Sequence, residues 1–154
     1  MRISDFLVPD AVLLDLHADN KKDVLAELLQ PLAKAGKISD AKRMVEVLLE
    51  REELGSTGIG GRIAIPHGKA AQVKELAASL GISKAGIAFD ALDGEPVNLF
   101  IALVAPDGSA GLHLKALARI SSLLKDKSFK KALLSAASVE DVLRLIENEE
   151  KEKG

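Results

Sequence analysis

Apolar residues recur every three or four positions in the first third of the chain, which is the spacing of one face of an α-helix. Asn20 precedes the first of these stretches and Ser39 or Asp40 the second, and these residue types cap helix N-termini. Gly36 and Gly55 follow the two stretches as predicted stops. The pattern therefore predicts two consecutive helices, with these apolar positions: Val24, Leu25, Leu28, Leu29 and Leu32, then Met44, Val47 and Leu48.

The last third of the chain shows the same helical spacing. A third helix is predicted after Gly111, and two further helices open at Ser128 and Ser138. Asp141 lies three residues after Ser138, which is close to the capping-box spacing. We expect the charged residues 149–154 to fray, which leaves an ordered core over about residues 3–147.

Four short apolar runs predict strands at 11–16, 62–65, 76–82 and 97–105. Asp93-Gly94 is a turn signal between the last two runs. The predicted order is a strand, two helices, three or four strands and three helices. This order favours one α/β domain over residues 1–154, with helices covering a mixed sheet.

Composition narrows the classes of function. The 154 residues are 47% hydrophobic and 29% charged, with a formal net charge of −2, which is typical of a globular domain. The mixed charges argue against a nucleic-acid interface, and no apolar run is long enough for a membrane helix. The chain has no Cys, so disulfides and thiolate chemistry are excluded, and aromatic residues are only 3%.

Three histidines are the first candidates for chemistry. His17 lies among polar residues and is expected at the surface. His67 lies between Pro66 and Gly68, and we expect it at the end of a strand beside a bend, where α/β proteins commonly bind ligands. His113 lies between leucines near the start of the third helix, where it could be a partly buried core residue or could meet a second group of a site.

The loop 55–61 contains four glycines, Ser56 and Thr57, and successive N–H groups in such a loop can bind an anion. It lacks the Gly-Lys-Ser/Thr ending of a nucleotide P-loop. Arg51 precedes the loop and is either a helix-end charge or a clamp for a phosphoryl group. Together with His67, these residues indicate phosphoryl chemistry at a histidine.

Other chemistries fit less well. The histidines lack the HExxH or H-x-H spacing of a metal site, so no metal is predicted. Residues 107–111 do not match the nucleophile elbow of serine hydrolases. A two-carboxylate glycosidase stays open on spacing alone, although the scarcity of aromatic residues argues against a sugar cleft.

Two stretches, 51–60 and 65–69, resemble the signature of the type 2 enzyme IIA domains of the bacterial phosphoenolpyruvate-dependent phosphotransferase system. Residues 89–97 and 113–121 also resemble segments of this family, which includes mannitol, fructose and nitrogen-regulatory members. The resemblance covers the chain from about residue 3 to 146. It implies a three-layer α/β/α sandwich around a mixed sheet, no cofactor, and a cytoplasmic phosphotransferase.

The resemblance also implies roles for individual residues. His67 would be phosphorylated, on Nε2, by a phosphorylated HPr-type carrier protein. His113 would donate a hydrogen bond to the phosphoryl group, and Arg51 would supply positive charge. The loop residues expected to border the phosphate are Ser56, Thr57 and Gly58.

Two branches of the family remain as alternatives for the biological role. The chain shows no attached HPr-like, IIB or membrane IIC segment, and with residues 89–94 this favours the standalone nitrogen-regulatory branch, which acts through phosphorylation-dependent partner binding. The alternative is a standalone fructose- or mannitol-type component that passes the phosphate to a IIB domain for sugar uptake.

Overall fold

A computed structural model describes residues 1–153. The helices are the 3₁₀ helix η1 (Ile3–Asp5), α1 (Lys21–Lys34), α2 (Ala41–Glu53), α3 (Ala110–Leu124), α4 (Lys127–Leu134) and α5 (Val139–Lys153). The strands are β1 (Leu7–Leu13), β2 (Gly58–Gly60), β3 (Ile63–Ala64), β4 (His67–Ala70), β5 (Ala77–Ile87) and β6 (Val97–Pro106).

The strands form one mixed sheet in the order β1-β5-β6-β3-β2, with β4 also paired to β6. β5 and β6 are antiparallel and form the centre, whereas β1 runs parallel to β5, and both β3 and β4 run parallel to β6. The connection between β5 and β6 contains the predicted turn, in which Gly94 has a φ of +73°.

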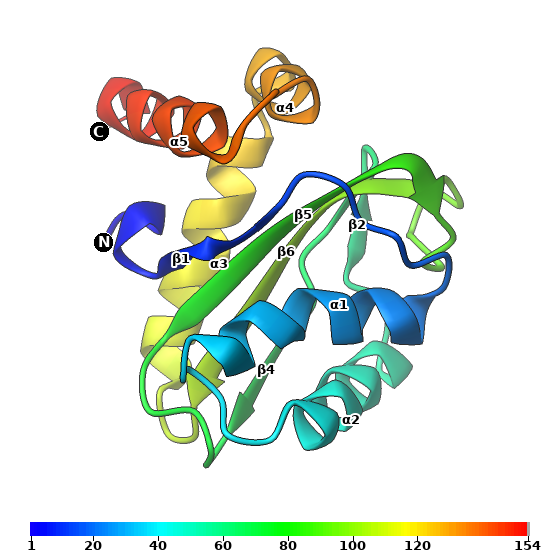
Figure 1. Ribbon diagram of the computed structural model, residues 1–154, viewed down its shortest axis with the longest axis vertical. Coiled ribbons are helices and arrows are strands. Elements are labelled where there is room, and N and C mark those ends of the chain that lie inside the picture. Colours follow the sequence, from blue (N-terminus) through cyan, green and yellow to red (C-terminus); the bar gives the residue numbers. More distant parts are fainter. Residues whose placement is uncertain (154) are drawn as a thin grey trace.

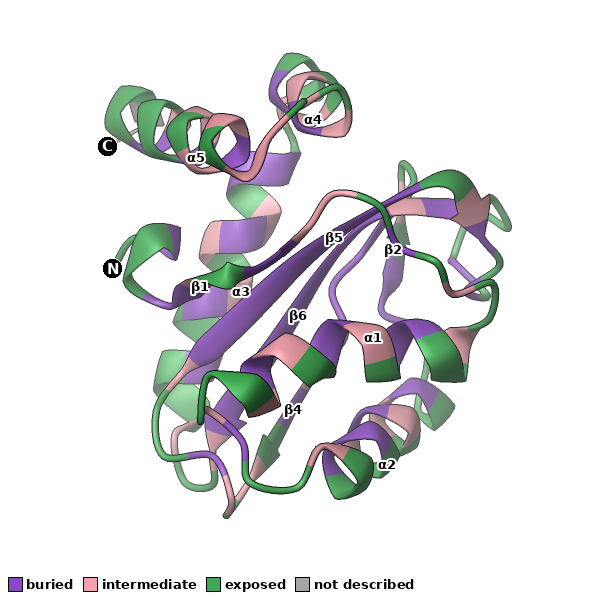
Figure 2. Ribbon diagram, viewed as in Figure 1, coloured by how far each residue is buried: buried purple, intermediate pink, exposed green. Residues whose placement is uncertain are grey.

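Two helical layers cover the sheet, as Figure 1 shows. α1 and α2 pack on one face, and η1, α3, α4 and α5 pack on the other. Successive residues of β6 belong to opposite cores: Phe100, Ala102 and Val104 face α1 and α2, while Leu99, Ile101 and Leu103 face α3 to α5. The central strands are therefore buried on both sides (Figure 2), and the predicted three-layer α/β/α sandwich is confirmed.

Local side-chain caps set most of the helix starts. Asn20 and Asp40 accept hydrogen bonds from the backbone N–H groups three residues on and cap α1 and α2, as predicted. The Ser138 hydroxyl accepts from the N–H of Asp141 at 3.1 Å before α5. The prediction for Ser128 was wrong, because Asp126 caps α4 and Ser128 lies inside that helix.

Strand positions differ from the prediction in several places, and β5 extends to Ile87, beyond the predicted run 76–82. β1 covers residues 7–13, not 11–16, because its pairing with β5 begins at Leu7. The predicted strand 62–65 is shorter, and after a break at Pro66 the chain resumes the pairing with β6 as β4. His67 therefore begins a strand that sequence patterning did not predict, and the glycine-rich loop contains β2.

In the predicted C-terminal tail 149–154, the residues up to Lys153 belong to α5, and residue 154 lies outside the described residues. Glu150 packs this end of the helix against the protein and is only 2% exposed. Its carboxylate accepts hydrogen bonds from the backbone N–H of Ile3 at 2.6 Å and from Arg119 Nε at 3.3 Å. The two ends of the chain are thus joined through one buried carboxylate.

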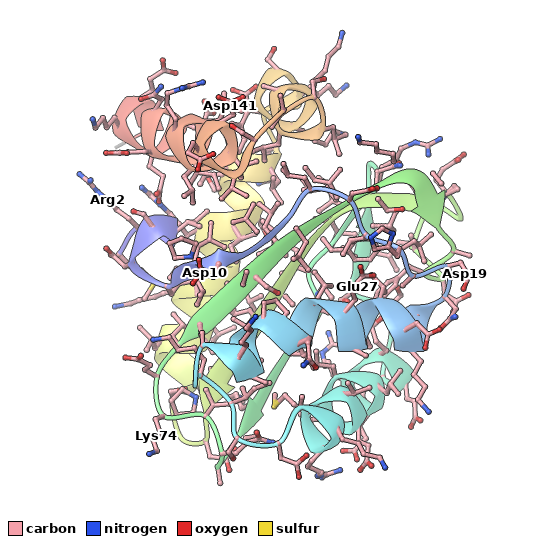
Figure 3. The ribbon with its side chains drawn as sticks, in the orientation of Figure 1. Arg2, Asp10, Asp19, Glu27, Lys74 and Asp141 are labelled. Atoms are coloured by element: carbon pink, nitrogen blue, oxygen red, sulfur yellow. The ribbon has the colours of Figure 1, made fainter. Side chains whose placement is uncertain are left out.

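A second carboxylate fixes the segment between β1 and α1. Glu27 of α1, labelled in Figure 3, accepts hydrogen bonds from the backbone N–H groups of His17 and Ala18. The His17 residue is exposed, as expected, and takes no part in the site described below. No helix among residues 1–153 is long and apolar enough to cross a membrane.

Candidate functional site

His67 lies at the break between β3 and β4. The carbonyl of Pro66 still accepts a ladder hydrogen bond from Leu103 N of β6 at 2.8 Å. The carbonyl of Ile65 instead lies 2.7 Å from Nδ1 of the His67 ring. A carbonyl can only accept, so Nδ1 carries the ring proton and the Nε2 lone pair is available as a nucleophile.

The rings of His67 and His113 are neighbours, with centroids 5.2 Å apart and an interplanar angle of 61°. His113 is the fourth residue of α3 and is only 7% exposed. Its Nε2 is buried and has no hydrogen-bond partner among the described residues. A buried polar atom without a partner is costly, so this nitrogen is positioned for a group that the protein alone does not provide.

Both imidazoles are favoured in the neutral form. Burial lowers the pKa of His67, and the charges of Arg51 and Lys69 act in the same direction, against opposing effects of the Ile65 bond and Glu52. Burial also lowers the pKa of His113 to about 4, with smaller contributions from His67 and Lys69. At neutral pH, the His67 ring is therefore uncharged, with the proton on Nδ1 and a free lone pair on Nε2.

Two surface depressions meet at His67. The larger, of about 630 Å³, is open and contains His67, His113, Arg51 and Lys69 on its walls. The smaller, of about 180 Å³, shares His67 and Arg51 with the first and extends to Ser56, Thr57 and Ser121. An open depression with a nucleophile on its wall suits a reacting group presented by another macromolecule.

Arg51 lies in the last turn of α2, directly before the glycine-rich loop. Its Nη1 donates a hydrogen bond to the carbonyl of Gly55 at 2.9 Å, which is a helix-end contact. Within residues 1–153, no ion pair neutralises this guanidinium. Its remaining N–H groups and its charge are thus available to an anion on the shared wall.

Ser56 and Thr57 of the loop line the smaller depression, whereas Gly58 lines neither depression, and most polar groups of these residues bond within the protein. The Ser56 hydroxyl donates to Phe89 O at 2.9 Å and accepts from Gly58 N at 3.0 Å. The N–H and hydroxyl of Thr57 both bond to the carboxylate of Glu52. Gly58 is required by packing, since a Cβ there would lie 2.9 Å from Ala91 Cα. The loop therefore shapes the wall beside His67.

Gly68 does not form the bend expected beside His67, because it lies inside β4. A Cβ at this position would lie 2.9 Å from Val47 Cγ1 and 3.1 Å from Leu48 Cδ2 of α2. Glycine is therefore needed here so that β4 can approach α2 closely.

Sequence reasoning missed Glu52 and Lys69. Lys69 lies two residues after His67 on β4, so both side chains lie on the same face of the strand and line the same depression. The sequence prediction missed Lys69 because it placed no strand there. Glu52 is 7% exposed although it stands in a charged run. The available signal was spacing, because Met44, Leu48 and Glu52 follow each other at four-residue intervals on the buried face of α2.

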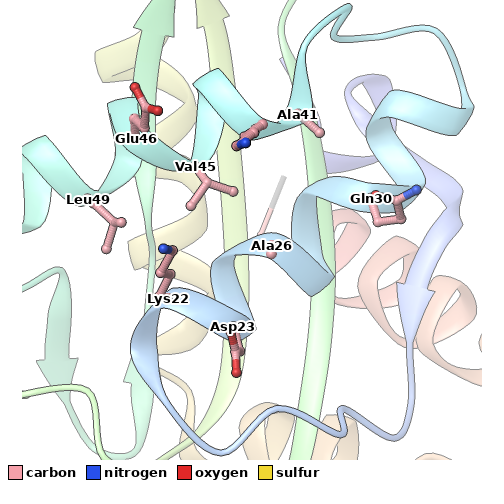
Figure 4. Close-up of a pocket in the computed structure, with 9 residues that line it drawn as sticks. Lys22, Asp23, Ala26, Gln30, Ala41, Val45, Glu46 and Leu49 are labelled. Carbon is pink, nitrogen blue, oxygen red and sulfur yellow. The ribbon is translucent and has the colours of Figure 1, made fainter.

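A separate depression of about 370 Å³ lies between α1 and α2, shown in Figure 4. Ala26, Val45 and Leu49 supply its apolar wall, and Lys22, Asp23 and Glu46 also line it. It contains no histidine. Among residues 1–153, no group of three or more His, Cys, Asp or Glu side chains could hold a metal ion.

Comparison with known proteins identifies a protein family that matches most of the chain. Residues 5–149 match the family described as "Phosphoenolpyruvate-dependent sugar phosphotransferase system, EIIA 2". The chain is 38% identical over 151 residues to the "PTS system fructose-specific EIIABC component" of Bacillus subtilis, and it spans 24% of that longer protein. It is 37% identical over 148 residues to the "Nitrogen regulatory protein" of Bradyrhizobium diazoefficiens, with 95% of each chain covered.

The fold has a solved counterpart. The crystal structure of nitrogen regulatory protein IIA-Ntr from Neisseria meningitidis superposes with a TM-score of 0.87 at 32% sequence identity. The match covers 94% of this chain and 98% of that one. The match over residues 5–149 and the shared fold agree with each other, and the chain belongs to the type 2 EIIA family of the phosphoenolpyruvate-dependent phosphotransferase system.

Proposed function

We propose that this protein accepts a phosphoryl group on Nε2 of His67 from a phosphorylated HPr-type carrier protein and uses it for regulation through phosphorylation-dependent partner binding. The observation that carries the proposal is the 2.7 Å contact between His67 Nδ1 and Ile65 O, which leaves Nε2 unprotonated beside Arg51 and His113. The proposal treats residues 1–154 as one EIIA domain that acts in the cytoplasm.

The transfer itself requires little covalent chemistry from the protein. Nε2 of His67 attacks phosphorus in line, one P–N bond forms, and the P–N bond to the histidine of the donor breaks. The electron pair of the broken bond returns to the donor imidazole. His67 Nδ1 keeps its proton throughout, because it stays bonded to the Ile65 carbonyl.

Charge stabilisation comes from two directions. Arg51 offers a planar, charged set of N–H donors to the phosphoryl oxygens. His113 Nε2, which lacks a partner in the unmodified protein, donates a hydrogen bond when it carries the ring proton. We assign Ser56, Thr57 and Gly58 to the phosphate-binding wall, where Thr57 acts by holding the loop, since Glu52 occupies its donors.

Phosphorylation changes the charge of the surface that surrounds His67. A phosphoryl group adds about −1.5 to −2 charge at neutral pH, judged from phosphorylated hydroxyl residues. The whole chain has a formal net charge of −2, so the change is large and local. A partner that contacts this depression would distinguish the two forms by electrostatics alone.

The regulatory role is favoured by the near-complete, end-to-end match to a nitrogen regulatory protein. The second candidate is a sugar-specific component that passes phosphate to a IIB domain, favoured by the match to a fructose-specific EIIABC component. The two roles share the chemistry at His67 and differ in the acceptor.

The proposal is tested by incubating the protein with phosphoenolpyruvate, enzyme I and HPr, followed by mapping of the phosphorylated site. Wild type should gain an acid-labile, base-stable phosphate, and His67→Ala should gain none. Full labelling of His67→Ala would exclude this site. Transfer from the labelled protein to purified IIB domains would favour the transport role, whereas retention of the phosphate with phosphorylation-dependent partner binding would favour regulation.

A further inference from the structure

Glu52 is a buried carboxylate that the phosphoryl chemistry does not use directly. Its side chain is 3% exposed, and Lys21 Nζ of α1 lies 3.5 Å from Oε1. Lys21 also lies over the ring of Phe89, with Nζ 4.8 Å from the ring centroid. A buried charge must be paired and hydrogen-bonded, so Lys21 compensates this carboxylate and limits its repulsion of a phosphoryl group.

Both oxygens of Glu52 accept hydrogen bonds from one residue of the glycine-rich loop. Thr57 N donates to Oε1 at 3.1 Å, and the Thr57 hydroxyl donates to Oε2 in a short hydrogen bond. Thr57 is 4% exposed, so both donors need an acceptor inside the protein. A carboxylate satisfies both at once, which explains an acidic residue at the end of the apolar face of α2.

The same hydrogen-bonded chain continues to the nucleophile. The carbonyl of Thr57 accepts from Ile65 N at 3.0 Å, and the carbonyl of Ile65 accepts from His67 Nδ1 at 2.7 Å. Thr57 and Ile65 thereby connect the carboxylate to the ring. We propose, on the basis of the function proposed above, that Glu52 is a positioning residue for phosphoryl transfer, which fixes the ring orientation and tautomer of His67 through Thr57 and Ile65.

The first test uses the unphosphorylated protein with ¹⁵N-labelled histidine, observed by NMR. In wild type, the His67 signals should be those of the Nδ1–H tautomer. Glu52→Gln keeps the size of the side chain but replaces one acceptor oxygen with a donor, so the His67 signals should shift toward a mixture of tautomers. The matched control is Glu53→Gln, which removes an exposed charge one residue on and should leave them unchanged. Unchanged His67 signals in a folded Glu52→Gln protein would overturn the proposal.

The second test measures phosphoryl transfer from phosphorylated HPr. Glu52→Gln should slow transfer by about tenfold, the loss expected when a charge-assisted hydrogen bond in the chain is weakened. If Glu52→Gln does not fold, variants of Thr57 are measured instead. Thr57→Val should slow transfer similarly, and Thr57→Ser, which keeps the hydroxyl, should restore the transfer rate. Wild-type rates in Thr57→Val would contradict the proposal. A wild-type protein that accepts no phosphate would contradict the proposed function instead, and the NMR measurement would still decide whether Glu52 orients His67.

Discussion

His67 on β4 and His113 on α3 meet edge to face, with ring centroids 5.2 Å apart. One ring comes from a strand and the other from a helix, and burial lowers the pKa of both. This pairing puts a neutral nucleophile next to a ring nitrogen that has no partner of its own. This relationship supports the proposed acceptance of a phosphoryl group on His67 and yields tests of it.

The first prediction concerns His113. His113→Ala should still accept phosphate on His67, but transfer should slow by roughly 10²–10³-fold, the cost of losing one positioned hydrogen bond to developing charge. Quench-flow measurement of transfer from phosphorylated HPr checks this value. His17→Ala is the control, because it makes the same chemical change at an exposed histidine outside the site. Unchanged kinetics together with lower thermal stability would show that His113 is a core residue only.

The second prediction concerns Arg51. Arg51→Lys keeps the charge at the end of α2 but loses the planar set of donors, so the melting temperature should stay nearly constant while transfer slows clearly. Arg51→Ala should be slower still, and its stability should fall by only about 0.3–1 kcal/mol. Arg43→Lys on the exposed side of α2 serves as the control. A wild-type transfer rate for Arg51→Lys would reduce Arg51 to a helix-end charge.

The third prediction is a dependence of stability on pH. Burial lowers the pKa of His113 to about 4 in the folded protein, from an ordinary 6.5 in the unfolded chain. Between these values the unfolded state binds more protons, so stability is full above about pH 6.5 and falls as the pH drops toward 4. The loss should be on the order of 1–3 kcal/mol and visible in urea unfolding curves.

His113→Gln separates this effect from other titrations. The variant should lose clearly less stability than wild type between about pH 7 and pH 4.5, because it lacks the group that must gain a proton. Equal losses in both proteins would show that the acid sensitivity comes from other residues.

The fourth prediction uses two glycines near the site. Gly68→Ala should destabilise the protein by about 1–3 kcal/mol, because the new Cβ would overlap Val47 of α2. Gly111→Ala should instead stabilise it by about 0.5–1 kcal/mol, because Gly111 lies in α3 with no atom within 4 Å of the added Cβ. Melting curves of the two variants should therefore shift in opposite directions, and an unchanged or higher melting temperature for Gly68→Ala would contradict the packing described for β4.

Helix starts could be predicted from the sequence wherever the cap is local. Asn20 and Asp40 satisfy N–H groups three residues away, so the physical cause and the signal lie in the same few residues. The error at Ser128 has the same origin, because Asp126 is an equally good capping residue two positions earlier. Pro66, His67 and Arg51 could likewise be read as a candidate site from residue types and the family resemblance.

Long-range pairing decided what local patterns could not. β4 exists because β6 offers Leu103 to Pro106 as partners after the Pro66 break, and its short sequence His-Gly-Lys-Ala contains no β-branched or large apolar residue to indicate a strand. The approach of His113 to His67 likewise depends on how α3 packs over the sheet. No spacing along the chain reports such a contact.

Two glutamates show which features the sequence determined and which ones only the tertiary structure decided. Glu52 and Glu150 each stand in charged runs, yet each follows a buried stripe at four-residue spacing, Met44 and Leu48 for one and Val142 and Ile146 for the other. The sequence by itself determined that these positions face the core. Only the tertiary structure provides the donors that make a buried carboxylate stable there, Thr57 and Lys21 for Glu52, and Ile3 and Arg119 for Glu150. The physical reason is that burying a charge is favourable only when partners from distant segments of the chain arrive with it.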